Sequence, residues 1–233
     1  MIDRSLNYGR EIIKDFAIQA RNYKTVLDIG AGNGVDLLSY RSIENKCDLF
    51  ALEAYKPNIE ILNKNKIKTY DIDLEKDIFP FADNSIDIIN ANQILEHTKE
   101  FFWIMHETTR TLRLGGKFIL GVPNLASFHN RLLLLLGKQP SCIQVDSAHI
   151  RGFTKNGIVS AINNIWGGYK MVAFRGSNFY PFSPILAKPL SRIFPNGAVT
   201  IFIMFEKVDE YKNSDFLHYP IDKKLETNYY LGR

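Results

Sequence analysis

The sequence predicts a single α/β domain, residues 1–233, with a doubly wound and mostly parallel sheet. Short apolar segments with strand character alternate with amphipathic segments of helical period along most of the chain. One early strand runs into a loop that has a glycine at every second position. The length of 233 residues suits one such domain, and neither a linker nor an internal repeat divides it.

The elements are expected in a regular order. An N-terminal helix is predicted because apolar residues recur at helical spacing from Ile12 to Ala20. Thr98 and Thr154 are the expected N-caps of two later helices, and Gly115 is an expected C-terminal stop. The alternation predicts right-handed crossovers, which place helices on both faces of the sheet. Strands are expected at 25–30, 48–53, 67–74, 85–92, 117–124, 169–176 and 198–207, and further helices at 34–43, 58–67, 98–116, 127–137 and 154–165.

Two segments depart from this alternation. Residues 124–153 form an insertion with the helical sequence SFHNRLLLLLG at its core, and residues 176–197 form a proline-rich connection. The leucines of 132–136 would cover all sides of a helix, which favours core packing beneath the insertion. A lid over an apolar substrate and a patch that contacts a membrane are the alternatives. The tail 208–233 is polar and without periodicity, as in mobile segments or arms that bind a partner.

The charges exclude several classes of protein. The net charge is +4 and the pI about 8.9, but the basic residues are scattered and form no run. No nucleic-acid partner is therefore expected, and an anionic substrate is favoured only weakly. The N-terminus carries charges where a signal peptide is apolar, and the longest apolar run, 132–137, is too short to span a bilayer. We expect a cytoplasmic location without stable membrane insertion.

The cysteines give no sign of a disulfide or of a metal site. Cys47 and Cys142 are far apart, and neither has a histidine or cysteine at metal-binding spacing. Both are interpreted as reduced thiols inside the protein. The sequence therefore predicts no metal.

The glycine-rich loop GAGNG, residues 30–34, follows the strand VLDI. In open α/β sheets, ligands bind at the carboxyl ends of the strands, and glycines let a ligand approach the backbone closely. The spacing G-x-G-x-G differs from the dinucleotide pattern G-x-G-x-x-G. Asp28, just before the loop, would repel a pyrophosphate but would suit an ammonium group.

Glu53 ends the second strand, about twenty residues beyond the loop. In this architecture an acid at that position binds the ribose hydroxyls, because a carboxylate accepts two hydrogen bonds at once. A ribose and an ammonium without a pyrophosphate describe S-adenosylmethionine. The sequence therefore predicts this molecule as the cofactor.

Four segments carry a resemblance to a known family: VLDIGAGNG, FALEAYK, DLEKDIFPFADNSIDIINANQILEHT and TLRLGGKFILGVPN. They resemble motifs of the class I S-adenosylmethionine-dependent methyltransferases, in the broad group that methylates quinones and other small molecules. The resemblance covers residues 20–124 well and continues more loosely to the last strand. It implies an enzyme with a Rossmann-like, seven-stranded sheet whose last strand is antiparallel, and S-adenosylhomocysteine as the product. We expect a monomer or a homodimer.

The resemblance also implies a set of cofactor-binding residues. Asp28 and the glycine loop would hold the methionine end, and Glu53 the ribose. Asp73 would bind the adenine amino group, with Asp71 as the competing acid. Further implied contacts are Gly30, Ala31, Gly32, Ala54, Leu74, Asn90, Asn92, Gln93 and, as a lid from the N-terminal helix or else as a packing residue, Tyr8.

Candidate catalytic residues come from two segments. Methyl transfer from a sulfonium needs in-line positioning, and it needs a general base only where the acceptor keeps a proton. His97 follows the fourth strand and is expected near the methyl group, or else it supports the next helix. In the insertion, His149 would position or deprotonate the acceptor, and Arg151 would bind an anionic group. Alternatively, this pair fixes the insertion to the sheet.

The predicted reaction is methylation of an oxygen or nitrogen of a small molecule, with segments 124–153 and 176–197 shaping the acceptor site. The sequences NRLLLLLGKQP and HIRGFT resemble bacterial methyltransferases associated with surface polysaccharide synthesis. That resemblance implies a sugar nucleotide, a glycan unit or a phosphorylated precursor as acceptor. The alternatives are methylation of a lipid or quinone at the membrane surface, and a nicotinamide-dependent oxidoreductase on the same sheet.

Overall fold

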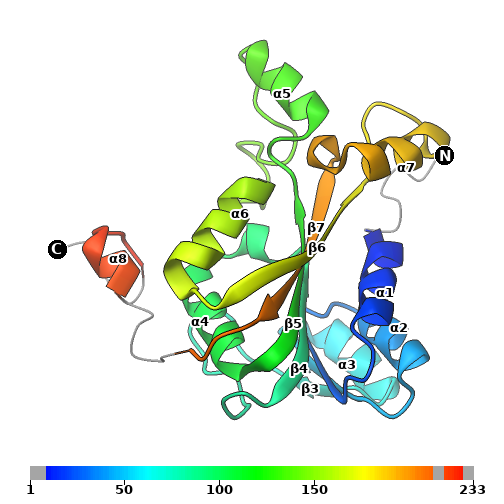
Figure 1. Ribbon diagram of the computed structural model, residues 1–233, viewed down its shortest axis with the longest axis vertical. Helices are drawn as coiled ribbons and strands as arrows, with labels where there is room; N and C mark the ends of the chain where they lie inside the picture. The colour runs from blue at the N-terminus through cyan, green and yellow to red at the C-terminus, as the bar shows by residue number, and fades with distance from the viewer. Residues whose placement is uncertain (1–8, 212–217, 228–233) are drawn as a thin grey trace.

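The computed structural model describes residues 9–211 and 218–227. Its centre is a seven-stranded sheet with the strand order β3-β2-β1-β4-β5-β7-β6 (Figure 1). The chain enters at β1 and adds strands first toward one edge and then toward the other, which is the doubly wound arrangement that the sequence predicts. The strands are β1 Thr25–Ile29, β2 Asp48–Leu52, β3 Lys68–Tyr70, β4 Ile86–Asn92, β5 Leu112–Pro123, β6 Tyr169–Ser177 and β7 Thr200–Lys207.

Strands β1 to β5 pair in parallel, whereas β7 pairs antiparallel with β5 on one side and with β6 on the other. The last strand is therefore the antiparallel one, as predicted. The carboxyl ends of β1, β2 and β4 lie at the same edge of the sheet, because neighbouring parallel strands point the same way.

Helices cover both faces of the sheet (Figure 1). On one face, α1 Arg10–Gln19, α2 Val35–Ile43 and α3 Lys56–Lys64 enclose a core that includes Phe16 and Leu37. On the other face, α4 Phe101–Thr111 and α6 Lys155–Ala161 enclose a second core. Short helical segments lie between the larger elements: η2 Leu95–His97, the π-helical η3 Ile162–Trp166 and η4 Pro195–Gly197.

The predicted helix 98–116 is wrong at both ends. It begins at Phe101, because the Thr98 hydroxyl donates to the Leu95 carbonyl and does not cap the helix. It ends at Thr111, and β5 begins at Leu112, which pairs with β4. The predicted strand 67–74 is also shorter, at Lys68–Tyr70. By contrast, Thr154 is an N-cap, since its hydroxyl accepts a hydrogen bond from the Gly157 amide at 3.1 Å.

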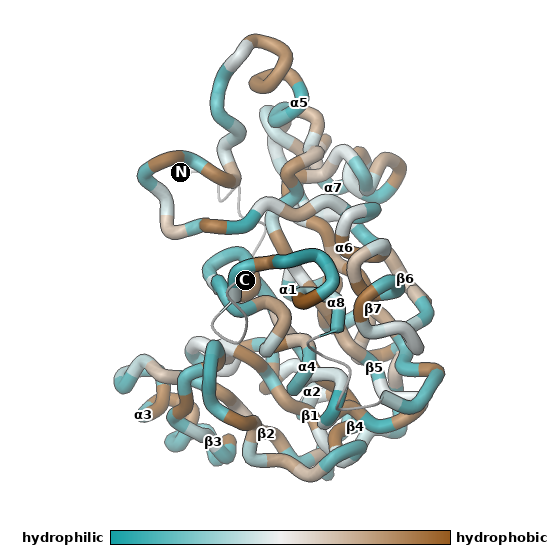
Figure 2. The backbone as a smooth tube through the Cα atoms, turned by 90° about the vertical axis from the view of Figure 1, so that its left-hand side faces the viewer, coloured by the Kyte–Doolittle hydropathy of each residue, from teal (hydrophilic) through white to brown (hydrophobic). Residues whose placement is uncertain are grey.

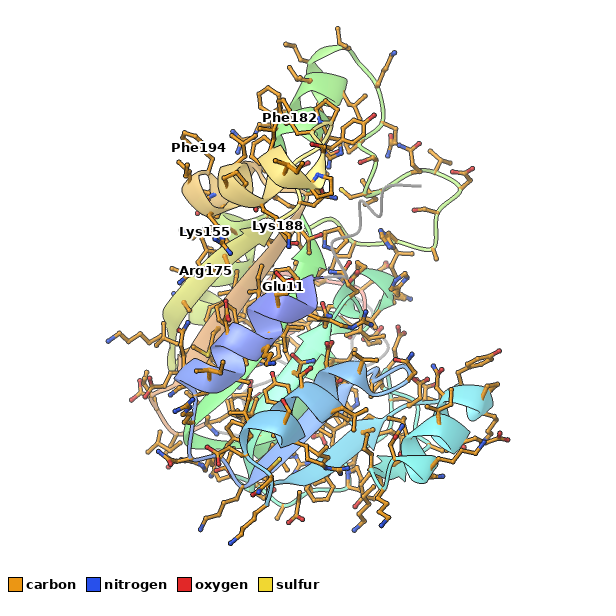
Figure 3. All side chains as sticks on the ribbon, turned by 90° about the vertical axis from the view of Figure 1, so that its right-hand side faces the viewer. Glu11, Lys155, Arg175, Phe182, Lys188 and Phe194 are labelled. Atoms are coloured by element: carbon orange, nitrogen blue, oxygen red, sulfur yellow. The ribbon has the colours of Figure 1, made fainter. Side chains whose placement is uncertain are left out.

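The two insertions extend the molecule beyond the carboxyl ends of the strands. They carry α5 Phe128–Leu135 and α7 Pro184–Ile193, which lie next to each other at the top of Figure 1. Lys188 of α7 reaches back to Glu11 of α1, with 3.6 Å between Nζ and Oε1 (Figure 3).

The prediction that the leucines of 132–136 form a core is wrong. Helix α5 projects away from the sheet (Figure 1), and four of the five leucines are exposed. Leu135 is 82% exposed and Leu136 is 69% exposed. The segment is hydrophobic at the far end of the molecule (Figure 2).

Part of the tail is described, and it packs on α4. The Tyr211 hydroxyl lies 2.8 Å from Nδ1 of His106, and the Tyr219 ring stacks on Phe102 with 6.1 Å between centroids. Tyr219 belongs to the short helix α8, His218–Asp222. Within residues 9–211 and 218–227, no helix has both the length and the apolar character that a membrane span requires.

Candidate functional site

The three glycines of the loop after β1 differ in what surrounds them: two are needed for packing, and one leaves space for a ligand. Gly30, Gly32 and Gly34 all have positive φ, at 67°, 54° and 80°. A Cβ at Gly30 would lie 2.7 Å from the Ile94 side chain, and one at Gly34 would lie 2.6 Å from Leu62. A Cβ at Gly32 would meet nothing within 4 Å. Packing therefore requires the outer two glycines, whereas Gly32 borders open space.

Glu53 is fixed beside this open space, immediately after β2. Its Oε2 accepts a hydrogen bond from the Gly32 amide at 2.8 Å, and its Oε1 accepts one from the Tyr55 amide at 2.8 Å. The Asn58 side-chain amide donates to Oε2 at 3.3 Å. These donors orient the carboxylate, which still has lone pairs for the two hydroxyls of a diol.

Asp28 is buried under the loop, at 3% exposure. Its Oδ1 accepts a hydrogen bond from the side-chain amide of Asn90 at 2.8 Å, and the Tyr40 hydroxyl donates to Asn90 Oδ1 at 3.3 Å. Burial, and next the nearby carboxylate of Asp36, raise the pKa of Asp28 well above its ordinary value. A cationic ligand group at this position would offset both effects.

Arg10 and Asp36 complete the cavity, and neither residue was predicted from the sequence. Oδ1 of Asp36 lies 3.4 Å from Nε of Arg10, and its Oδ2 accepts from the Asn92 amide at 2.9 Å. Burial is the main cause that raises the pKa of Asp36, and Asn92 and Arg10 oppose it. Asp36 stands in the first turn of α2, directly after the glycine loop, and this place in the sequence is a signal for it. Nothing in the sequence marks Arg10, because its contact depends on how α1 packs on α2.

The resulting cavity has a volume of about 200 Å³. Two polar atoms in its wall, Oδ1 of Asn92 and Nε2 of Gln93, are buried without a hydrogen-bond partner among the described residues. Gln93 also has φ 56°, an uncommon conformation for a residue with a side chain. Buried polar atoms are costly when unpaired, so these two indicate a polar ligand with both a donor and an acceptor. The lining residues are Arg10, Asp28, Gly30, Ala31, Gly32, Asn33, Val35, Asp36, Asn92 and Gln93.

The residues predicted for the adenine lie outside this cavity. Asp73 is exposed and pairs with Lys76 at 2.9 Å, and this contact is the first cause that lowers its pKa. Asp71 pairs with Lys56. Leu74 packs against the core below α4, and the remaining predicted contact on this side, Ala54, is exposed. Tyr8, the predicted lid, lies outside the described residues.

His97 and His149, 52 positions apart in the chain, lie side by side, with 4.6 Å between ring centroids. Together with Glu96 they offer one ligand atom each, all within 4.8 Å of one another. Burial raises the pKa of Glu96 to about 7. Arg151 lies apart from this group, because its guanidinium donates to the Lys99 carbonyl at 2.8 Å and covers the Phe101 ring.

A larger apolar cavity of about 510 Å³ lies between the two insertions. Phe179 and Phe182 line it, as do Phe128 and Arg131 of α5. Tyr180 contacts His129 and is absent from the lining. Segments 124–153 and 176–197 therefore meet around one cavity, at the end of the sheet where the glycine loop lies.

A sheet of this order, with a glycine loop after β1, an acid near the end of β1 (Asp28) and an acid directly after β2 (Glu53), defines the class I S-adenosylmethionine-dependent methyltransferase fold. The chain belongs to the family described as methionine biosynthesis protein MetW, whose sequence model matches residues 11–149. The resemblance noted in the sequence is thereby confirmed for the fold.

Solved structures with this fold align over most of the chain. One of these structures is the complex between the Haloferax volcanii Trm112 methyltransferase activator and a methyltransferase. The alignment with one of its chains spans 88% of the present protein and 92% of that chain, at 14% identity and a TM-score of 0.62. A SAM-dependent methyltransferase from Archaeoglobus fulgidus covers 85% and 94%, at 14% identity and a TM-score of 0.59. The Burkholderia thailandensis 1,6-didemethyltoxoflavin-N1-methyltransferase covers 89% and 80%, at 14% identity and a TM-score of 0.60.

A curated relative is an uncharacterized 37.1 kDa protein in transposon TN4556 of Streptomyces fradiae. It is 26% identical over 112 residues, which make up 46% of this chain. The match spans 32% of that relative's length.

Proposed function

We propose that the protein transfers a methyl group from S-adenosylmethionine to an oxygen or nitrogen of a small molecule. The observation that carries this proposal is the cavity at Gly32, where charged groups of both signs and two unpaired amide atoms surround open space. The amino-acid end of the cofactor is a zwitterion with a sulfonium nearby, so it fits a polar wall of this composition. The cofactor is S-adenosylmethionine, and the product is S-adenosylhomocysteine.

Each wall residue has a role that its contacts support. Asp28 faces the ammonium group, because its buried carboxylate lacks a cation of its own among the described ion pairs. Arg10 is the basic residue in the lining and binds the carboxylate of the methionine end. Asn90 holds Asp28 in place. Glu53 accepts the ribose hydroxyls while its backbone donors keep it oriented.

The unpaired amide atoms of Asn92 and Gln93 bond to the methionine end. Asp73 and the Leu74 amide bind the adenine, the role that the family resemblance implies for them. Asp73 then exchanges its contact with Lys76 for the adenine amino group. When bound, the cofactor supplies an electrophilic methyl group on a leaving group that is already positive. The task of the chain is therefore to align the acceptor and to exclude water.

The acceptor site lies on the insertions. The cavity of about 510 Å³ between α5 and α7 has the size of a small-molecule pocket and has aromatic walls with Arg131 at its border. Arg131 suits an anionic group on the acceptor. The acceptor remains the one implied by the sequence: a sugar nucleotide, a glycan unit or a phosphorylated precursor.

A second candidate, methylation of a lipid or quinone at a membrane surface, is favoured by the exposed leucines of α5. Leu132 and Leu135 of α5 are 46% and 82% exposed, and Leu136, directly after the helix, is 69% exposed, so the leucines form an apolar surface. Helix α5 projects farthest from the sheet, where it can touch a bilayer without hindrance (Figures 1 and 2). The aromatic cavity opens beside the same helix.

Titration calorimetry tests the cofactor part. The purified protein is titrated with S-adenosylmethionine, S-adenosylhomocysteine and, as control, NAD. Micromolar binding of the first two without binding of NAD supports the proposal, whereas binding of NAD alone would restore the oxidoreductase. An acceptor screen with radiolabelled cofactor then compares sugar nucleotides, phosphorylated sugars, quinones, lipids and, because of the family's description, amino-acid precursors of methionine.

Vesicle flotation separates the two acceptor classes. The double variant Leu135→Ser/Leu136→Ser is compared with the unchanged protein on vesicles with anionic lipid. A lipid-directed enzyme loses vesicle binding in the variant and keeps its affinity for the cofactor. No binding of the unchanged protein would remove the second candidate.

A further inference from the structure

A cluster outside the cofactor cavity combines an acid with two histidines. Glu96 and His97 form the end of η2, just after β4, and His149 comes from the insertion after β5. Their ligand atoms all lie within 4.8 Å of one another. No metal was predicted from spacing along the chain, because these residues meet only in the folded protein.

Glu96 is the most unusual member of the cluster. Its side chain is 1% exposed, and neither carboxylate oxygen has a hydrogen-bond partner among the described residues. Glu96 takes part in none of the described ion pairs. Arg151, the basic residue closest to His149 in the sequence, donates to the Lys99 carbonyl instead. Burying a carboxylate in this way is costly unless a cation is bound beside it.

Backbone carbonyls hold one nitrogen of each histidine ring. Nδ1 of His97 lies 3.3 Å from the Ala148 carbonyl, and Nδ1 of His149 lies 2.8 Å from the Cys142 carbonyl. A carbonyl oxygen can only accept, so each Nδ1 carries the proton in these contacts. The Nε2 lone pair of each ring is left for a cation. A backbone carbonyl behind a ligating imidazole is the usual support for such a ligand.

The backbone holds the two segments together. The Glu96 carbonyl accepts hydrogen bonds from the amides of Ile150 and Arg151, at 2.9 and 3.3 Å. Ligand atoms at about 2.1 Å from one ion lie roughly 3.0–3.4 Å apart when they occupy neighbouring positions of an octahedron or tetrahedron. The ligand atoms of the cluster lie within 4.8 Å of one another, so side-chain movements of about 1–2 Å bring them onto one ion. His97 is exposed, which gives an ion a route from solvent.

We propose that Glu96, His97 and His149 bind a divalent first-row transition metal such as Zn²⁺ or Mn²⁺, with coordination positions left open. Two imidazole ligands favour these ions over Mg²⁺ and Ca²⁺, which prefer oxygen. Three protein ligands leave at least one position for an oxygen of a substrate or for water.

The role of the ion rests on the proposed function. Glu96 is three residues beyond Gln93, which lines the cofactor cavity, so an ion here lies close to the site of methyl transfer. Its open position would hold an acceptor oxygen in place. His97 and His149 then serve as ligands, and neither acts as a general base. Metal binding itself is independent of methyl transfer and is tested without any methyl acceptor.

The test is metal binding by the full chain after treatment with EDTA and dialysis. ZnCl₂, MnCl₂ and MgCl₂ are each added in calorimetry, and bound metal is counted by elemental mass spectrometry. We expect one Zn²⁺ or Mn²⁺ per chain and no comparable binding of Mg²⁺. His149→Ala and Glu96→Gln should each weaken binding at least tenfold. His129→Ala, in which a half-buried histidine of α5 is removed, is the matched control and should bind as the unchanged protein does.

Melting temperatures supply a second readout. In EDTA, Glu96→Gln should melt at or above the unchanged protein, because it removes a bare buried charge. With Zn²⁺ the order should reverse, because only the unchanged protein gains stability from the ion. Equal loss of binding in His129→Ala, or absence of a bound ion in the unchanged protein, would overturn the proposal. Cofactor titration in EDTA decides separately whether the proposed function stands.

Discussion

Gly32 and Gly137 have the same backbone restriction but different surroundings. Their φ values are 54° and 66°, and at both positions an added Cβ would meet nothing within 4 Å. Gly32 borders the cofactor cavity, and Gly137 follows α5 on the surface. Either change to alanine should cost about 1–2 kcal/mol of stability, because the left-handed conformation disfavours a side chain.

Only Gly32→Ala should also weaken binding of S-adenosylmethionine, by about tenfold or more, because its methyl group occupies space that the cofactor needs. Calorimetry and thermal melts of the two variants provide the comparison. Equal affinities in both variants would show that the open space at Gly32 is not the cofactor site.

Asp28→Asn should separate stability from binding. Because burial and Asp36 raise the pKa of Asp28, the folded protein holds this proton more tightly than the unfolded chain does. Its contribution to stability is therefore present below the ordinary carboxyl pKa of about 3.9 and is lost as the pH rises through the raised value. Asparagine removes the charge and keeps an oxygen for the Asn90 amide.

At neutral pH the unliganded Asp28→Asn variant should melt above the unchanged protein, and this difference should shrink toward pH 4. Its affinity for the cofactor should fall about tenfold or more, since the ammonium loses a charged partner. Asp48→Asn, at an exposed position of β2, is the control and should change neither quantity. A less stable Asp28→Asn protein at neutral pH would contradict this account of the site.

The sequence indicated those site residues that follow each other in one loop or end a strand. Asp28, the glycines and Glu53 were predictable because loop and strand end carry their own pattern. Arg10 and Asp36 were missed because their ion pair depends on the packing of α1 against α2. His97 and His149 were both noted, but their contact needs the path of the whole insertion, which no local pattern contains.

At the scale of elements, Lys207 explains how α4 ends and β5 begins. Its buried Nζ donates to the Thr109 carbonyl at 2.8 Å, to the Leu112 carbonyl at 2.7 Å and to Oδ1 of Asn84 at 2.7 Å. The last carbonyls of a helix lack partners within the helix, and a cation from β7 satisfies them here. A helical sequence pattern that ran on to Gly116 could not reveal this contact from a distant strand.

Lys207→Met should therefore destabilise the protein by about 1–3 kcal/mol, because two buried carbonyls and the Asn84 side chain lose their donor at once. The control is Lys170→Met. Lys170 is exposed on β6, so this change removes the same charge and should leave the free energy of unfolding nearly unchanged. Urea unfolding of both variants measures the difference. Similar midpoints for the two variants would mean that Lys207 does not hold this junction together.

For the whole molecule, the doubly wound, mostly parallel sheet followed from the alternation of elements, and its seven strands and antiparallel last strand followed from the family resemblance. The packing of the two insertions that carry α5 and α7 could not be predicted in this way. The leucines of α5 suggested a core, but a core needs a second layer, and the helix projects beyond the sheet (Figure 1). Sequence periodicity reports which residues avoid water on average, and it does not show whether another element is there to cover them.

The cofactor cavity joins parts that are distant in the chain, and this leads to a prediction for the whole fold. Its wall takes Arg10 from α1, the loop after β1, and Asn92 and Gln93 from the end of β4. A ligand that bonds to all three stabilises the folded protein only. At a concentration of one hundred times its Kd, the gain is about 2.7 kcal/mol. For a chain of this size that corresponds to a rise in Tm of about 5–10 °C.

S-adenosylmethionine and S-adenosylhomocysteine should both produce this rise in a thermal-shift experiment, and NAD should not. Hydrogen exchange should slow in the same three segments, because the ligand links them, while the tail helix α8 exchanges as before. Gly32→Ala should lose most of the shift, and Gly137→Ala should keep it. A shift with NAD, or protection confined to one segment, would mean that the cavity does not bind its ligand across α1, β1 and β4.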